Sequence, residues 1–180
     1  DAGVRNSIQI HFYSPAPITL PAAGPEISQQ ILNLINSENI IFHDSCKIKS
    51  VEKNKLIFQN GEADFDLLLA IPPHIAPKVI YDSRLANDGG FIPINRDCKT
   101  SFENVYAVGD VTTLTVVDTI SVPKAGIFAE GEAIAVAQNI ISKIQSKKES
   151  ALFDGKGGCF IESGRDTASL IEVDMFSEPK

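Results

Sequence analysis

The chain has 180 residues, 43% of them hydrophobic, which is enough to bury the core of one large domain or of two small ones. Its 23 acidic and 16 basic residues give a net charge of −7 and form no basic stripe, so no nucleic-acid partner is expected. No apolar run approaches the ~18 residues of a membrane span. Three cysteines without a Cys-x-x-Cys pair and three scattered histidines argue against a disulfide scaffold and against a metal site. Small molecules are therefore the expected partners.

Residues 1–77 predict a strand, a helix and a β-meander. The strand covers Ser7–Tyr13, and the helix starts at Pro25 and runs to about Ser37. The meander is predicted from three apolar runs, Phe42–Val51, Leu56–Gln59 and Phe65–Ile71, with Asn60-Gly61 as the hairpin turn between the last two. Pro72-Pro73 then break the pattern, and we place a domain boundary near Pro77.

Residues 78–180 predict two short strands, a long helix and a C-terminal hairpin. The strands are Gly90–Ile94 and Val105–Val108, and a polar linker at Ser146–Ser150 precedes the hairpin, which turns between Ser163 and Asp166. The helix begins after Pro123. One stripe of this helix is predicted to pack on a sheet because its apolar residues recur at helical spacing: Ile127, Ile134, Ala137, Ile141 and Ile144.

A Gly-Asp pair follows the predicted strand Val105–Val108. Glycine allows the backbone to approach a ligand closely, and ligands of open α/β sheets bind at the carboxyl ends of strands. A carboxylate there suits the hydroxyls of a ribityl or ribose chain. Gly109, Asp110 and Val111 are therefore candidate cofactor-binding residues, with an ordinary strand-to-turn Gly-Asp as the alternative.

The start of the long helix supplies the second candidate segment. Ala125 and Gly126 carry little bulk over the first turn, so its unpaired amides stay open to a ligand. A helix start attracts negative charge, and together with the Lys124 ammonium it would stabilise a reduced flavin, which is negative on its pyrimidine side. The alternative is an ordinary core helix with a solvated lysine. Taken together, the two segments indicate half of a flavin site.

These segments resemble a known family. Ala107–Asp110 and Pro123–Glu130 are similar to the C-terminal flavin motifs of FAD-dependent pyridine nucleotide-disulfide oxidoreductases, above all of sulfide:quinone oxidoreductases. Asp66–Pro73 and Asp154–Gly164 resemble the same branch, which includes the flavin subunit of flavocytochrome c sulfide dehydrogenase. The resemblance implies an α/β fold of the glutathione-reductase type with two dinucleotide-binding domains. Residues 1–77 would be the second half of the NAD(P)-binding-like domain, and residues 78–180 the C-terminal part of the FAD-binding domain.

The resemblance also implies a cofactor and roles for the candidate residues. FAD would pass two electrons from sulfide to a quinone. Gly109 and Asp110 would hold its ribityl and phosphate region, while Lys124, Ala125 and Gly126 would line the pyrimidine edge of the ring. Cys159, which follows two glycines, would be the catalytic residue that relays sulfur, although a cysteine without a redox role is the alternative.

Two departures from the family pattern limit this interpretation. No Gly-x-Gly-x-x-Gly occurs, so we expect the C-terminal fragment of a longer protein, with an incomplete FAD site and no activity of its own. The family's C-terminal amphipathic helices have no counterpart before Lys180, so the acceptor is either a quinone, reached through peripheral membrane contact, or a soluble molecule. The compartment stays open between cytoplasm and membrane surface.

A third departure concerns nicotinamide. The predicted strand Ile8–Tyr13 ends in Ser14-Pro15, where an NADH-binding domain carries Asp or Glu for the ribose hydroxyls. We therefore expect a domain that keeps the shape without binding NADH. Three alternatives to a sulfide:quinone oxidoreductase remain: an NADH-dependent flavin dehydrogenase, a soluble subunit like that of flavocytochrome c sulfide dehydrogenase, and a noncatalytic scaffold.

Overall fold

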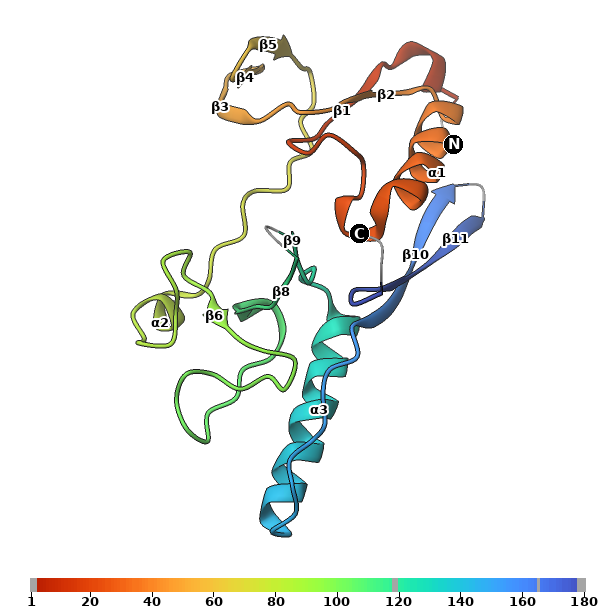
Figure 1. Ribbon diagram of the computed structural model, residues 1–180. Helices are drawn as coiled ribbons and strands as arrows, with labels where there is room; N and C mark the ends of the chain where they lie inside the picture. Colours follow the sequence, from red (N-terminus) through yellow and green to blue (C-terminus); the bar gives the residue numbers. More distant parts are fainter. Residues whose placement is uncertain (1–2, 118–119, 165, 178–180) are drawn as a thin grey trace. The chain divides into compact units, whose positions relative to one another are not determined.

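The computed structural model describes residues 3–117, 120–164 and 166–177 (Figure 1). Within these ranges the chain divides into two compact units, and the boundary along the chain falls between Pro72 and Pro73. Arg165, which belongs to the predicted turn of the hairpin, lies outside the described residues.

The first unit begins with two parallel strands joined by a helix. The crossover matches the predicted strand and helix, and its elements are η1 (Arg5–Ser7), β1 (Ile10–Tyr13), η2 (Pro21–Ala23), α1 (Gly24–Ser37) and β2 (Ile40–His43). β1 and β2 pair in register, with Ile10 opposite Ile40 and Tyr13 opposite His43. Proline lies in the first turn of α1, where its missing N–H costs no intrahelical hydrogen bond.

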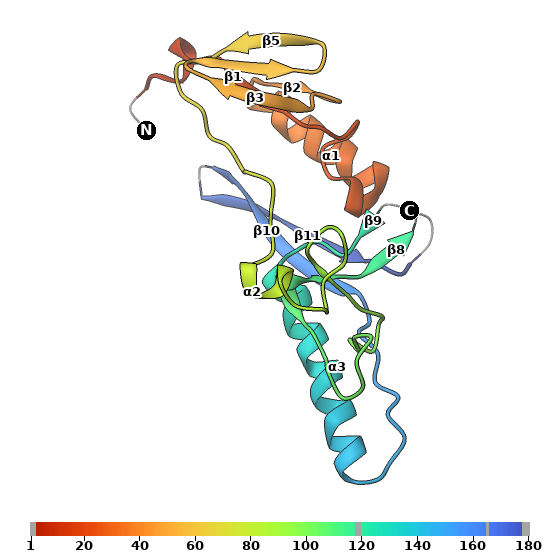
Figure 2. The ribbon, with the colours of Figure 1, turned by 90° about the vertical axis from the view of Figure 1, so that its left-hand side faces the viewer.

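A three-stranded antiparallel meander follows, as predicted, but with different boundaries. Its strands are β3 (Ile48–Glu52), β4 (Lys55–Phe58) and β5 (Gly61–Asp64), visible in Figure 2. The predicted single strand Phe42–Val51 is wrong, because the chain turns at Ser45, whose φ is 53°, and so separates β2 from β3. Leu56 and Phe58 on β4 are buried.

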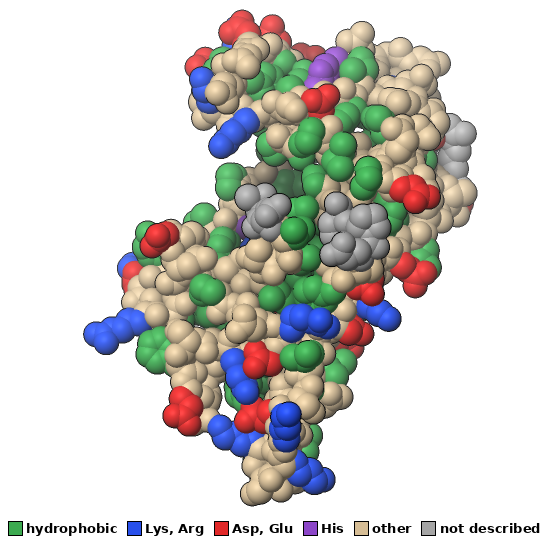
Figure 3. Space-filling view, viewed as in Figure 1, with side chains coloured by type: hydrophobic (Ala, Val, Ile, Leu, Met, Phe, Trp, Pro, Cys, Tyr) green, Lys and Arg blue, Asp and Glu red, His purple; other side chains and the backbone are tan. Residues whose placement is uncertain are grey.

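The predicted strand Phe65–Ile71 is also wrong. Its residues lie outside every described strand, and the meander uses Gly61–Asp64 instead. A strand exists only where a neighbour completes its hydrogen-bond ladder, and no described strand pairs with this segment. Its alternate side chains are left in solvent, with Leu67 78%, Leu69 88% and Ile71 89% exposed. Hydrophobic side chains on the surface are visible in Figure 3.

The second unit contains several short elements before its long helix. They are α2 (Lys78–Tyr81), β6 (Ile92–Pro93), η3 (Gly109–Val111), β7 (Thr112–Thr113), β8 (Thr115–Val117) and β9 (Ile120–Ser121). β6 pairs with β7 in parallel, and β8 pairs with β9 antiparallel. The predicted strand Val105–Val108 is wrong, since only Tyr106 forms an isolated bridge, to Lys99. Val105 instead forms a local turn. Its N–H donates to the Phe102 carbonyl, and its carbonyl accepts from the Thr100 N–H.

The long helix α3 (Gly126–Ile144) forms as predicted, but a different face is buried. The predicted stripe is open to solvent, with Ile127 42%, Ile134 52% and Ile141 54% exposed. The buried residues instead follow the spacing 4, 3 and 4: Phe128, Glu132, Ala135 and Asn139. Apolar side chains occur on more than one side of α3, so periodicity alone selected the wrong side.

Side chains and backbone from the returning chain cover the buried face of α3. The ring of Phe153 meets that of Phe128 edge to face, with centroids 6.2 Å apart. The Asn139 amide donates to the carbonyl of Ala151 and accepts from its N–H, both at 2.9 Å. Cys98 lies on the same side, with its thiol 3.8 Å from the Glu132 carbonyl.

The predicted C-terminal hairpin is present. Its strands β10 (Lys156–Gly164) and β11 (Thr167–Asp174) pair antiparallel, with Cys159 opposite Ile171. Fully buried Phe153 and Met175 anchor its base. Within the described ranges, no helix has both the length and the apolar character needed to cross a bilayer.

Candidate functional site

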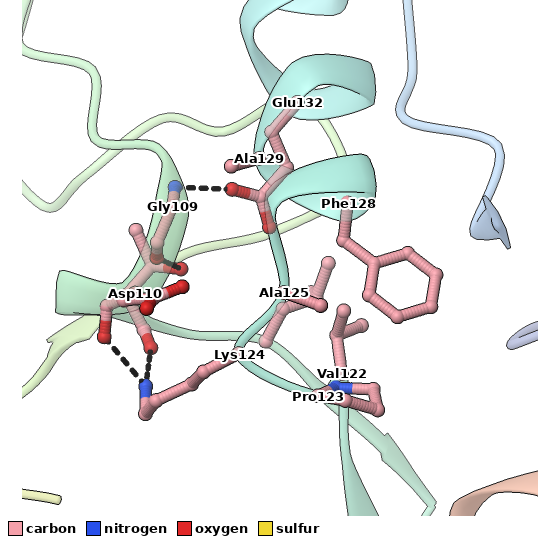
Figure 4. Close-up of a pocket in the computed structure, with 11 residues that line it drawn as sticks. Gly109, Asp110, Val122, Pro123, Lys124, Ala125, Phe128, Ala129 and Glu132 are labelled. Carbon is pink, nitrogen blue, oxygen red and sulfur yellow. Dashed lines mark hydrogen bonds between the residues drawn. The ribbon is translucent and has the colours of Figure 1, made fainter. Parts of the chain in front are cut away.

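The two segments selected from the sequence meet in one recess of the second unit (Figure 4). It forms where the turn η3 faces the first two turns of α3. Gly109, Asp110, Lys124 and Ala125 line it, whereas Val111 and Gly126 do not. The other lining residues are Thr112, Leu114, Val122, Pro123, Phe128, Ala129 and Glu132. The recess is thus built from residues of both candidate segments.

Gly109 begins the turn on one wall of the recess. Its φ of 79° lies in the left-handed region, which glycine adopts without strain. A Cβ at this position would lie 3.4 Å from that of Ala129 on α3, so the turn approaches the helix closely. The Thr112 hydroxyl donates to the Gly109 carbonyl at 2.8 Å and closes the turn.

Glu132 is a site residue that sequence reasoning missed. Its side chain lies inside the unit with only 3% of the residue exposed, and it accepts a 2.6 Å hydrogen bond from the Gly109 N–H. Burial raises the pKa of this carboxyl, while the Gly109 bond and the Lys124 charge act in the opposite direction. Glu132 follows Phe128 by four residues, so the two lie on the same face of the helix. This spacing is a signal in the sequence that could have identified Glu132 as a buried residue.

Lys124 closes the other end of the same turn. Its ammonium donates to the carbonyls of Asp110 at 2.7 Å and of Thr112 at 2.8 Å, and it lies 3.9 Å from the centroid of the Phe91 ring. Burial lowers the pKa of Lys124, and the nearby Asp110 and Glu132 oppose that shift. The ammonium therefore binds backbone carbonyls of the turn rather than standing free in solvent.

The start of α3 is as open as its small residues suggested. Ala125 is extended, and no side chain caps the first turn. A Cβ on Gly126 would meet no atom within 4 Å. Because the first amides of a helix have no intrahelical acceptor, this end attracts an electronegative group.

The three cysteines lie in different environments, and none forms a disulfide. Cys98 is completely buried, and burial followed by the charges of Glu132 and Asp97 raises the pKa of its thiol to about 12. Cys46 is half-buried, and Cys159 is exposed. Cys159 lies outside the recess but on the same face of β10 as Gly157, whose added Cβ would lie 2.5 Å from the Phe128 ring.

In the first unit, Ser14 follows β1 where a carboxylate would serve a nicotinamide ribose. Ser14 is buried, its N–H donates to the His43 carbonyl, and its carbonyl accepts from the Cys46 N–H. Its hydroxyl accepts a 3.2 Å hydrogen bond from the Ala16 N–H. The N–H, the carbonyl and the hydroxyl of Ser14 therefore all form hydrogen bonds within the first unit.

Residues 7–142 match the pyridine nucleotide-disulphide oxidoreductase family. The chain therefore belongs to this family. The family and the α/β fold class predicted from the sequence are both confirmed.

Similarity to individual relatives extends over nearly the whole chain. The mitochondrial sulfide:quinone oxidoreductase of Schizosaccharomyces pombe is 27% identical over 98% of this chain and 39% of its own length. The sulfide-quinone reductase of Aquifex aeolicus is 24% identical over 99% of this chain and 45% of its own length. The coenzyme A disulfide reductase of Staphylococcus epidermidis is 32% identical, but only over 49% of this chain and 21% of its own length. The chain thus spans less than half the length of these relatives.

A solved structure gives the same picture of the fold. The sulfide:quinone oxidoreductase from Aquifex aeolicus superimposes with a TM-score of 0.84 at 23% sequence identity. The match covers 96% of this chain and 44% of that one.

Proposed function

We propose that this chain carries part of the FAD site of an oxidoreductase that moves two electrons from sulfide to a quinone or to a soluble acceptor. The main support is the recess in which Gly109 and Asp110 face Lys124 and Ala125 across the start of α3. Similarity to two sulfide:quinone oxidoreductases over nearly the whole chain supports the choice of substrates.

The residues of the recess fit a flavin. The Asp110 carboxylate can accept hydrogen bonds from ribityl hydroxyls. The open first turn of α3 would favour negative charge on the pyrimidine edge by about 0.3 to 2 kcal/mol, and Gly126, where an added Cβ would meet no atom within 4 Å, adds no bulk at that turn. Bound FAD would supply the capacity to take up two electrons and hand them on. Val111 would contribute backbone to the same turn.

Cys159 would be the catalytic thiol in this proposal. A thiolate is the nucleophilic form of cysteine, and the exposed position of Cys159 gives sulfur species access to it. Sulfide loses two electrons as it becomes zero-valent sulfur, which Cys159 would hold as a persulfide. The acceptor gains these two electrons. If that acceptor is a quinone, the protein needs peripheral contact with the bilayer.

The test uses the native holoprotein under anaerobic conditions. Purified protein should carry FAD, recognised by its absorbance, and sulfide should bleach it. Asp110→Ala should lower flavin retention sharply, and unchanged retention would count against the site. Cys159→Ser should abolish bleaching by sulfide, whereas Cys46→Ser, the matched control in the first unit, should leave it intact.

An NADH-dependent flavoenzyme is the second candidate. It is favoured by the pyridine nucleotide in the description of the matched family. The absence of a carboxylate at Ser14 argues against it. Rapid bleaching by NADH, with none by sulfide, would decide for this candidate. Purified protein without any flavin would instead favour a noncatalytic scaffold.

A further inference from the structure

We propose that Glu132 is a positioning residue for the cofactor, because it holds the Gly109 amide and so fixes the turn that presents Asp110. This inference rests on the proposed flavin site. It adds a function to a side chain that the site's motifs do not contain, and it assigns to that side chain an influence on flavin redox chemistry.

The geometry of the turn is the first support. The Gly109 N–H donates to Glu132 at 2.6 Å, and at the other end the Lys124 ammonium donates to the carbonyls of Asp110 and Thr112. Asp110 therefore lies between the Glu132 and Lys124 side chains, which hydrogen-bond to its own backbone and to that of its neighbours (Figure 4). Hydrogen bonds to ionised groups are roughly twice as strong as neutral ones, so the hydrogen bonds from Lys124 in particular restrict the turn.

The identity of the acceptor is the second support. Burial disfavours a carboxylate, and within the described residues Glu132 forms no ion pair that would offset the cost. A neutral amide oxygen could accept the same bond from Gly109. In its ionised form, Glu132 would place a negative charge beside the recess, where it would oppose the negative charge that a flavin gains on reduction.

The charged and titratable groups around Glu132 come from three segments of the chain. Asp110 lies on the turn, Lys124 lies on the loop before α3, and the Cys98 thiol lies 3.8 Å from the Glu132 carbonyl. The Cys98 thiol, whose pKa burial raises to about 12, stays protonated at neutral pH. Glu132 is thus the buried carboxyl beside the recess, and Glu132→Gln replaces it with an amide that cannot ionise.

Two substitutions separate the hydrogen bond from the charge. Glu132→Gln keeps an acceptor for Gly109 but removes the charge, so FAD affinity should stay within about threefold while the flavin midpoint potential rises. Glu132→Leu removes the acceptor, and FAD affinity should fall about tenfold or more because the amide of Gly109 is left unpaired. Glu130→Gln is the matched control. It makes the same charge change at an exposed position of the same helix and should alter neither property.

The measurements are FAD titration of the apoprotein, anaerobic potentiometry of the holoprotein, and the NMR shift of the Gly109 amide proton. Wild-type affinity in Glu132→Leu would overturn the inference while leaving the proposed function intact. If that variant does not fold, Glu132→Gln decides, since an unchanged midpoint potential and an unchanged Gly109 shift would overturn it. Failure of the wild-type protein to bind FAD would overturn the proposed function and this inference together.

Discussion

Gly157 on β10 rests against the ring of Phe128 in the first turn of α3. A Cβ built on Gly157 would lie 2.5 Å from the ring and 3.1 Å from the Ile127 side chain. The hairpin can therefore cross the helix start only because residue 157 has no side chain. Cys159 follows on the same face about 7 Å farther along the strand, so this contact fixes the distance of its thiol from a residue that lines the recess.

Substitution of Gly157 should destabilise the second unit. We expect Gly157→Ala to lower the free energy of unfolding by about 1 to 3 kcal/mol, because the added methyl overpacks the buried Phe128. Gly126→Ala is the control, since a Cβ there meets nothing within 4 Å. Urea unfolding of both variants provides the measurement, and equal stability of the two would contradict the contact.

Asn139 should be essential for holding the returning chain on α3. The residue is 1% exposed, and its side chain both donates to and accepts from the backbone of Ala151. Asn139→Leu leaves both backbone groups without their partner, at a cost of about 1 to 3 kcal/mol for each group that stays buried. Gln138→Leu, on an exposed position beside it, is the control. Thermal unfolding that fails to separate the two variants would refute the assignment.

The stability of the second unit should depend on the ionisation of Glu132. Burial raises the pKa of this carboxyl above its ordinary value of 4.5, so the folded state binds the proton more tightly than the unfolded state. The resulting stabilisation is complete below 4.5 and is lost as pH rises through the folded pKa. Glu132→Gln should therefore gain stability relative to wild type as pH increases.

Urea unfolding between about pH 4 and pH 8 measures this difference. Glu130→Gln, which removes an exposed carboxylate, should follow the wild-type curve. Parallel curves for wild type and Glu132→Gln would show that the folded state does not shift the ionisation of Glu132.

The three thiols should react with alkylating reagents in a fixed order. Cys159 is exposed and should be modified first, followed by the half-buried Cys46. Cys98 should remain unmodified in the native protein, because it is fully buried and the pKa of its thiol is raised to about 12. Mass spectrometry after iodoacetamide treatment, with and without denaturant, checks the order. Early modification of Cys98 would contradict the packing around Glu132.

Local patterns predicted the elements whose neighbours are close in sequence. α1, the middle strand of the meander and the C-terminal hairpin depend on helix starts and short turns, which a few adjacent residues specify. The predicted strands Phe65–Ile71 and Val105–Val108 failed because a strand depends on a neighbour that its own residues cannot provide. The face of α3 was misassigned for a similar reason, since its partners Ala151 and Phe153 come from the returning chain.

The sequence by itself determined the family, the α/β class and the two segments that form the recess, because glycine, proline and small residues act through backbone geometry at their own positions. Only the tertiary structure decided that Glu132 holds Gly109 and that Lys124 binds the carbonyls of Asp110 and Thr112. The partners in these contacts lie 12 to 23 residues apart in sequence. Contacts of this kind arise only when packing brings separate elements together, and burial then changes the ionisation of the groups involved.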